Sequence, residues 1–112
     1  VAAKVVDLMR KKGIYHKDAR ALILGITFKE NFNDIRNSKI PEIYKALETE
    51  GIEVEVYDPI ADPELVKKQY GISLTKTPQK YEAVILAVAH QGFLEKGVGQ
   101  YKNPDGAIVF DI

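Results

Sequence analysis

The apolar positions of this chain follow two periodicities, one typical of strands and one typical of helices. Runs or alternations typical of strands occupy residues 20–25, 52–57, 72–75, 83–88 and 107–112. Apolar residues at helical spacing occupy residues 1–12, 38–50 and 62–70, and a short helix is expected beyond the loop that starts at His90. Because strands alternate with helices, the pattern predicts an α/β fold with parallel strands and right-handed crossovers.

The two segments with uninterrupted apolar residues, 20–25 and 83–88, are expected side by side in the middle of the sheet. Five strands then take the order 3-2-1-4-5 along the chain, in a Rossmann-like three-layer sandwich with a mainly parallel sheet. The topological switch point falls between the first and fourth strands, where ligands bind outside the carboxyl ends. Two loops, residues 25–37 and 88–92, leave the sheet at that point.

Local signals place the ends of the helices. Ser38 is expected as the N-cap of the second helix, with Pro41 in the first turn, where a missing N–H costs little. Asp62 and Pro63 are expected at the N-cap and first position of the third helix, and Gly71 beyond its end.

The loop between the first strand and the second helix carries the candidate chemistry. Its polar residues are Lys29, Glu30, Asn31, Asn33, Asp34, Arg36 and Asn37. A helix N-terminus offers free N–H groups and a partial positive charge, to which Lys29 and Arg36 add full charges, so the loop is predicted to bind an anion.

Each loop side chain also has a structural alternative. Lys29 contacts a ligand or is a solvated surface lysine, and Phe28 stacks on a base or covers the core. Arg36 clamps a phosphate with two hydrogen bonds or pairs with Asp34 to shape the loop.

The same region does not match a dinucleotide site of the usual Rossmann type. Its first turn contains only Gly25 and lacks the G-x-G-x-x-G spacing. Asp58 follows the second strand, where a ribose-binding acid would lie, but without those glycines the start of an Asp-Pro turn is favoured. For His90, a role in loop ordering or helix capping is favoured over catalysis.

Composition excludes several classes of function. The chain has 112 residues, with 16 Lys+Arg and 16 Asp+Glu, so there is no basic excess for a broad nucleic-acid or membrane surface. No apolar run approaches the ~20 residues of a membrane span. Cysteine is absent and histidines number 2, so we expect no metal site and no cysteine nucleophile in this chain. No export signal is recognised, which favours the cytoplasm.

With these residues in view, nearly the whole chain resembles the C-terminal, UDP-sugar-binding domain of the UDP-glucose/GDP-mannose dehydrogenase family. The family pattern G-x-x-F-K-x-x-T-x-D-x-R-x-S-P is met by Gly25, Phe28, Lys29, Asp34, Arg36 and Ser38. Phe32 replaces the Thr and Lys39 replaces the Pro. V-Y-D-P at residues 56–59 and A-H-x-x-F at residues 89–93 also fit. The loop is most similar to the branch that oxidises UDP-N-acetylhexosamines.

The resemblance implies roles for the loop residues. Phe28 and Lys29 match substrate-binding residues at the UDP-sugar, and Arg36 matches an arginine that reaches the phosphates of the cofactor NAD from the facing domain. Gly25, Asp34 and Ser38 are then read as loop-shaping residues. No catalytic residue and no metal ligand is implied within this chain.

It also implies a larger protein. Residues 1–13 match the end of a helix that connects to a middle domain, and residues 14–112 match the nucleotide-sugar-binding domain. An N-terminal NAD-binding domain and a dimer-forming middle domain would lie outside this chain. Family members oxidise the sugar C6 hydroxyl to a carboxylate in two hydride transfers to NAD, for surface polysaccharide precursors. This chain alone is therefore expected to be inactive. The alternative is a stand-alone Rossmann-like nucleotide-binding or regulatory module.

Overall fold

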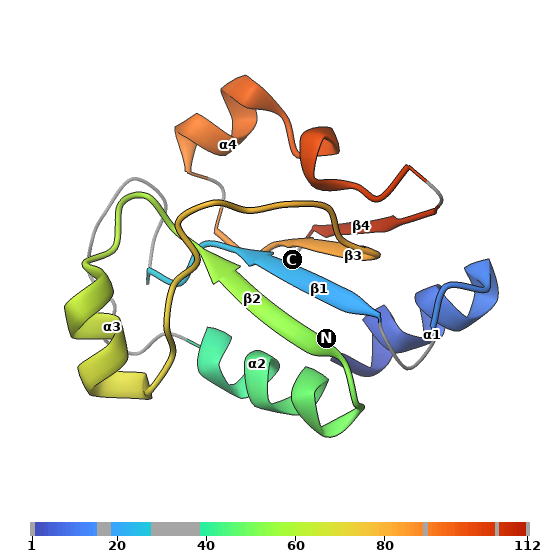
Figure 1. Ribbon diagram of the computed structural model, residues 1–112, viewed down its shortest axis with the longest axis horizontal. Helices are drawn as coiled ribbons and strands as arrows, with labels where there is room; N and C mark the ends of the chain where they lie inside the picture. Colours follow the sequence, from blue (N-terminus) through green and yellow to red (C-terminus); the bar gives the residue numbers. More distant parts are fainter. Residues whose placement is uncertain (1, 16–18, 28–38, 89, 105, 112) are drawn as a thin grey trace.

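The computed structural model describes residues 2–15, 19–27, 39–88, 90–104 and 106–111 (Figure 1). The helices are α1 (Ala2–Lys12), α2 (Ile40–Thr49), α3 (Pro63–Tyr70) and α4 (Gln91–Lys96), with a 3-10 turn η1 (Gly99–Tyr101). The strands are β1 (Arg20–Leu24), β2 (Glu53–Tyr57), β3 (Ala83–Leu86) and β4 (Ile108–Asp111). Strands and helices alternate as the periodicity predicts.

The four strands form one parallel sheet in the order β2-β1-β3-β4. β1 pairs with β2 from Arg20 opposite Glu53, and with β3 from Ala21 opposite Ala83. The central position of the two uninterrupted apolar strands is thus confirmed. Their burial explains the pattern, because each lies between two neighbours and is covered on both faces.

The expectation of five strands is wrong for the described residues, which contain four. The predicted third strand, 72–75, makes a single parallel bridge between Leu74 and Val56, with Thr75 N–H donating to Val56 C=O at 2.8 Å. The extended stretch between the end of α3 and Pro78 is short, and the chain leaves the edge of β2 after this one pair.

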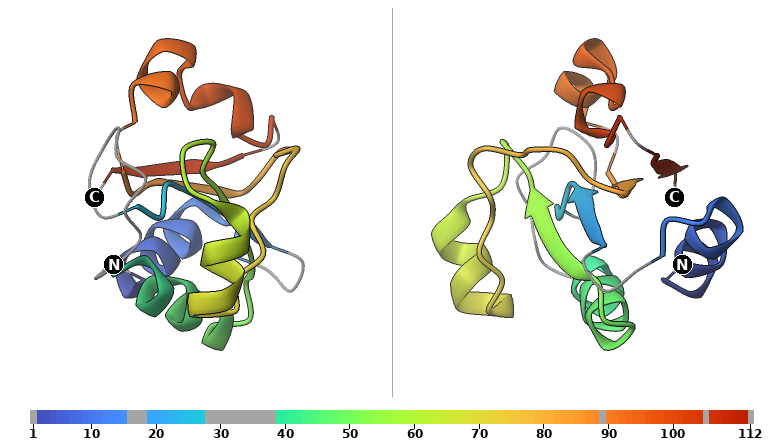
Figure 2. Two further views of the ribbon diagram at one scale, coloured as in Figure 1. Left: turned by 90° about the vertical axis from the view of Figure 1, so that its left-hand side faces the viewer. Right: turned by 45° about the vertical axis from the view of Figure 1, so that its right-hand side comes forward.

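Helical elements cover both faces of the sheet, as the views in Figures 1 and 2 show. On one face, buried residues of α1, α2 and α3 pack against alternate residues of the strands; they include Val5, Met9, Leu47 and Val66 from the helices and Ile23, Val56 and Ile85 from the sheet. On the other face, Phe93 of α4 and partly buried Tyr101 of η1 pack against Leu22, Leu24 and Val84. The arrangement is that of a Rossmann-like α/β fold.

The helix ends bear out one local prediction and correct another. Asp62 caps α3 by accepting the Glu64 N–H at 2.9 Å, and Gly71 ends it in the left-handed conformation with φ of 72°. The N-cap of α2 is Lys39, not Ser38, and Lys39 makes no side-chain cap. Pro41 removes one of the two N–H groups that a capping side chain would satisfy, which weakens the need for serine there.

Candidate functional site

The carboxyl ends of β1, β2 and β3 converge at the predicted switch point. The N–H of Gly25 donates to Tyr57 C=O at 3.0 Å, while the N–H groups of Ala87 and Val88 donate to Leu24 C=O at 3.0 and 3.1 Å. The chain that follows β1 therefore leaves the sheet between the ends of both neighbouring strands. In parallel α/β sheets this is where ligands bind.

Gly25 is required at this point by space as well as by backbone conformation. Its φ is +100°, and a Cβ atom there would lie 2.5 Å from Cβ and 3.0 Å from the backbone N of Val88. Only glycine allows the chains leaving β1 and β3 to approach so closely.

Asp58 is the centre of a buried polar cluster at the same edge of the sheet. Its Oδ2 accepts the N–H groups of Ile26 at 2.8 Å and Thr27 at 3.3 Å. Its Oδ1 accepts those of Ile60 at 2.9 Å and Ala61 at 3.1 Å. One carboxylate therefore connects the chain leaving β1 to the turn that leads from β2 to α3.

His90 joins this cluster from the chain that follows β3. Its Nε2 lies 3.0 Å from Asp58 Oδ2 and 3.2 Å from Thr27 Oγ1, and its side chain is 1% exposed. The ring also packs against Phe93 of α4, with centroids 5.6 Å apart. At the backbone, His90 occupies the N-cap position of α4 without a side-chain capping bond. The structure therefore favours loop ordering over capping for this residue.

These contacts decide between the two interpretations of Asp58, a ribose-binding acid and the start of an Asp-Pro turn. Its side chain is 0% exposed, and both oxygens accept backbone N–H groups, so it is not placed to bind the ribose of a dinucleotide. It instead closes the Asp-Pro turn that the sequence favours. Together with the missing G-x-G-x-x-G, this means that the described residues do not fit a Rossmann-type NAD site.

Most of the sequence-predicted site lies outside the described residues. This holds for Phe28, Lys29, Asp34, Arg36 and Ser38. Gly25 is described, at the end of β1. Thr27, two residues further on, is 2% exposed and belongs to the buried cluster, although the sequence pattern does not predict a role for it. Its position just beyond an uninterrupted apolar strand was the available signal.

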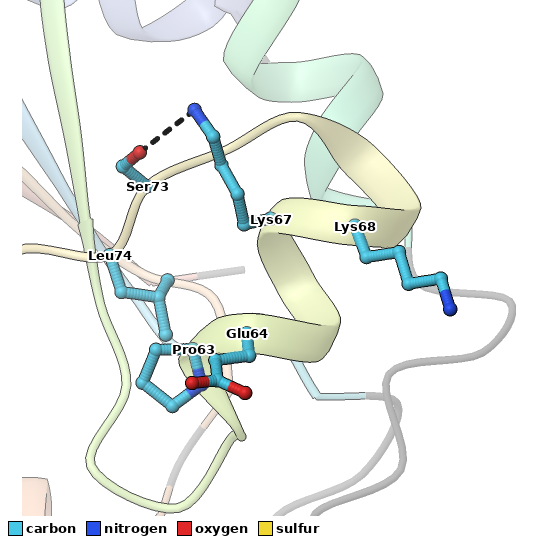
Figure 3. A pocket seen from close by; sticks show the side chains of 6 residues that line it. All are labelled: Pro63, Glu64, Lys67, Lys68, Ser73 and Leu74. Carbon is cyan, nitrogen blue, oxygen red and sulfur yellow. Dashed lines mark hydrogen bonds between the residues drawn. The ribbon is translucent and has the colours of Figure 1, made fainter.

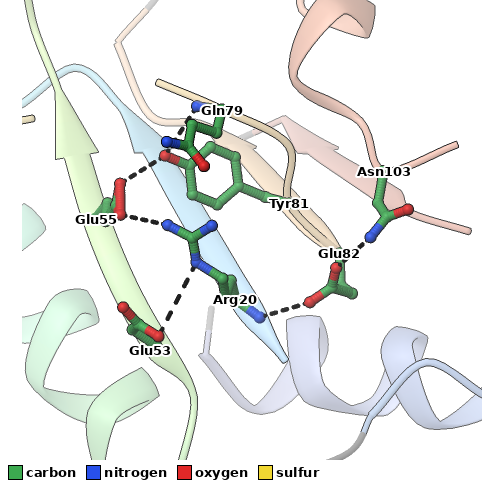
Figure 4. A network of polar contacts seen from close by, with 7 residues as sticks. All are labelled: Arg20, Glu53, Glu55, Gln79, Tyr81, Glu82 and Asn103. Carbon is green, nitrogen blue, oxygen red and sulfur yellow. Dashed lines mark hydrogen bonds and ion pairs between the residues drawn. The ribbon is translucent and has the colours of Figure 1, made fainter. Parts of the chain in front are cut away.

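A second polar cluster, at the amino ends of the strands, was also missed (Figure 4). Arg20 pairs with Glu55, whose Oε2 accepts the Tyr81 hydroxyl at 2.6 Å. Burial and then the bond to Glu55 raise the pKa of Tyr81 to about 12. Glu82 accepts the backbone N–H of Arg20 at 2.8 Å and the amide of Asn103 at 2.7 Å. The available signal was the alternation of Glu53 and Glu55 along β2 beside the arginine that opens β1.

A shallow groove, lined by residues of neither cluster, lies between α3 and the extended segment after it (Figure 3). It encloses 370 Å³ and is lined by Pro63, Glu64, Lys67, Lys68, Ser73 and Leu74. Lys67 Nζ donates to Ser73 Oγ at 3.1 Å. Its wall is mainly apolar, and it shares no residue with the switch point.

The described part of the chain contains neither a metal-ligand cluster nor a membrane-spanning helix. No group of three or more His, Cys, Asp or Glu side chains is placed there to hold a metal ion. Every described helix is too short or too polar to cross a bilayer.

Comparisons with known proteins agree with this geometry. The family model of the UDP-glucose/GDP-mannose dehydrogenase family, UDP binding domain, matches residues 22–112. UDP-N-acetyl-D-glucosamine 6-dehydrogenases of Salmonella typhi and Pseudomonas aeruginosa are 42% and 40% identical over 100% and 87% of this chain. The chain spans only 27% and 24% of their lengths.

A solved structure gives the same result in three dimensions. A UDP-glucose dehydrogenase from the hyperthermophilic archaeon Pyrobaculum islandicum superposes with a TM-score of 0.71 at 27% identity, over 98% of this chain and 25% of that one. Fold, motif and sequence similarity therefore agree: the chain belongs to the UDP-glucose/GDP-mannose dehydrogenase family, and residues 22–112 are its UDP binding domain.

Proposed function

We propose that this chain holds the UDP moiety of the sugar substrate in an NAD-dependent UDP-sugar 6-dehydrogenase. The observation that carries the proposal is the match of residues 22–112 to the family's UDP binding domain, in a fold whose switch point lies where the matching loop begins. The two UDP-N-acetylglucosamine dehydrogenase relatives support a UDP-N-acetylhexosamine as the substrate.

The loop after Thr27 supplies the ligand contacts in this proposal. Lys29 neutralises the diphosphate, and Phe28 packs against the nucleotide beside it. Arg36 reaches the cofactor phosphates, while Gly25, Asp34 and Ser38 give the loop its shape. Residues 1–13 belong to the connection with a middle domain that forms the dimer.

The reaction itself needs groups that this chain does not contain. NAD, bound mainly by another domain, would accept hydride as the C6 hydroxyl is oxidised to a carboxylate. A thiol nucleophile would also come from elsewhere, because this sequence has no cysteine. We therefore expect the 112-residue chain alone to bind UDP weakly and to produce no NADH. We assign the whole enzyme to the cytoplasm and to precursor synthesis for surface polysaccharides.

A titration tests the proposal directly. UDP is added to the chain and followed by amide chemical shifts or calorimetry, with NAD as the comparison ligand. The variant is Lys29→Ala, and the matched control is Lys45→Ala, which removes an exposed lysine from α2. We expect a Kd near the millimolar range for wild type and control, and about tenfold weaker binding for Lys29→Ala.

The ligand comparison separates the alternatives. UDP binding that is lost with Lys29 supports the UDP-holding role. Tighter binding of NAD than of UDP would contradict it and favour a nucleotide-binding module of another kind. Equal effects of Lys29→Ala and Lys45→Ala would remove Lys29 from the site.

A further inference from the structure

We propose that Asp58 and His90 are positioning residues for the nucleotide: they hold the backbone at Thr27, directly before Phe28 and Lys29. The inference rests on the proposed function, because Phe28 and Lys29 are the residues assigned to UDP there. It adds two residues that do not touch the ligand but set where the ligand-binding segment starts.

Asp58 extends the sheet beyond the point where β2 turns away. The last register pair joins Leu24 to Tyr57, and Gly25 N–H still reaches Tyr57 C=O. The β1–β2 register ends at that pair, and no residue of β2 lies opposite Ile26 and Thr27. Asp58 Oδ2 accepts the N–H groups of both instead. The Asp58 carboxylate thus replaces the acceptors that a neighbouring strand would supply, and it fixes two more residues of the chain leaving β1.

His90 completes this arrangement from the opposite side. Both carboxylate oxygens of Asp58 already accept N–H groups, so Nε2 of His90, 3.0 Å from Oδ2, is the donor in that contact. The same nitrogen lies 3.2 Å from Thr27 Oγ1. Thr27 is therefore held at its backbone by Asp58, and its Oγ1 shares the single Nε2–H of His90, from the chain after β3, with Asp58 Oδ2 in a three-centre contact.

The chemistry of the cluster is hard to explain by packing alone. Buried polar groups add little net stability compared with apolar residues of the same volume, whereas they fix one arrangement because each partner must be in place. Here three chain segments leave the switch point, and one residue from each meets in the cluster: Thr27, Asp58 and His90. The fixed arrangement ends one residue before the segment assigned to UDP.

The test measures UDP binding by the 112-residue chain in variants that remove single contacts. His90→Leu keeps an apolar body and removes the donor to Asp58. His90→Gln keeps an N–H donor at a comparable reach and is the matched rescue. Thr27→Val removes the hydroxyl without changing the shape, with Thr27→Ser as its control. Thermal unfolding of each variant reports the folded fraction, and affinities are counted per folded molecule.

We expect His90→Leu to weaken UDP binding about tenfold, because the loss of a buried hydrogen bond releases the start of the loop. His90→Gln should stay within about threefold of wild type. Thr27→Val should weaken binding while Thr27→Ser does not, which keeps the test decisive if His90→Leu fails to fold. Lowered stability with unchanged UDP affinity in both His90→Leu and Thr27→Val would overturn the proposal.

Amide hydrogen exchange separates this proposal from the proposed function. In His90→Leu we expect faster exchange at the N–H groups of Ile26 and Thr27, with the Glu53 N–H, which bonds Ala19 C=O, unchanged. If wild type bound no UDP, the proposed function would fail for this chain. Faster amide exchange of Ile26 and Thr27 in His90→Leu would still support the holding contact. Unchanged exchange there would overturn it whatever UDP does.

Discussion

Two polar clusters lie at opposite ends of the same sheet, and their charged side chains have different kinds of hydrogen-bond and ion-pair partners. At the carboxyl ends, the Asp58 side chain is 0% exposed and four backbone N–H groups point to its oxygens. At the amino ends, Arg20 and Glu55 are 27% and 26% exposed and pair mainly with other side chains.

This difference determines how rigidly each end of the sheet is held. Backbone donors are fixed by the fold, so no side-chain entropy is lost to hold them, and in the buried cluster solvent does not screen the charge. Long side chains at the amino ends can rearrange, and their pairs are weakened by water and salt. The end of the sheet that we propose receives the ligand is thus held by the main chain, whereas the side-chain pairs at the opposite end can rearrange. Three substitutions test this contrast.

The largest loss of stability is expected for Asp58→Ala. It leaves four backbone N–H groups and His90 without their acceptor in a buried place, which should lower the free energy of unfolding by about 3–5 kcal/mol. Urea unfolding measures it. The matched control is Asp62→Ala, another aspartate that accepts a backbone N–H, but exposed at the N-cap of α3, where about 1 kcal/mol is expected. Similar losses in the two variants would mean that burial does not set the cost.

Gly25→Ala should follow, at about 2–4 kcal/mol, because its Cβ would overlap Val88 and φ of +100° disfavours a side chain. Gly51→Ala is the control. It has a similar φ of +83° but nothing within 4 Å of the added Cβ, so only the conformational cost of about 1–2 kcal/mol applies. Equal losses would show that the chains leaving β1 and β3 can separate without penalty. Circular dichroism melts of both variants give the comparison.

The smallest effect, and one that depends on pH, is expected at the amino ends. The pKa of Tyr81 is raised from 10.0 to about 12, so the folded state favours the neutral phenol. Its contribution is fully present below pH 10 and is lost as the pH rises through 12, by up to about 2–3 kcal/mol. Tyr81→Phe should lower stability by about 1 kcal/mol at neutral pH and flatten the alkaline loss.

Urea midpoints at neutral and alkaline pH, for wild type and Tyr81→Phe, measure that contribution. Glu55→Gln removes the neighbouring negative charge and should reduce the alkaline loss in part. If wild type and Tyr81→Phe lost the same stability between neutral and alkaline pH, other groups would account for the loss.

The sequence alone predicts the layout of this domain well, since layout depends on local patterns. Uninterrupted apolar residues mark β1 and β3 as central strands because both of their faces are buried. Asp62 and Gly71 mark the ends of α3 because capping acts within a few residues. The predictions of a Ser38 N-cap and of a strand at residues 72–75 were wrong. At the start of α2 the capping preference competes with Pro41, and at residues 72–75 the connection is too short for more than one bridge.

These local patterns do not predict the buried cluster of Thr27, Asp58 and His90. That Asp58 follows a strand is visible in the sequence, and a turn there is the correct inference. That its carboxylate accepts N–H groups 31 and 32 positions away depends on the register of β1 with β2, which no local signal specifies. The same holds for His90, 32 positions from Asp58. The loop residues assigned to UDP, Lys29 among them, remain predictions.

The central place of β1 also has a consequence for how the chain acquires its structure. Arg20 reaches Glu82, 62 positions later, through a bond that forms only when the second half of the domain is present. During synthesis β1 therefore stays unpaired on one side until β3 has left the ribosome, with an apolar edge exposed in the meantime. Such distant pairing makes folding slow, so a ribosome that stalls before residue 83 would release a chain prone to aggregation.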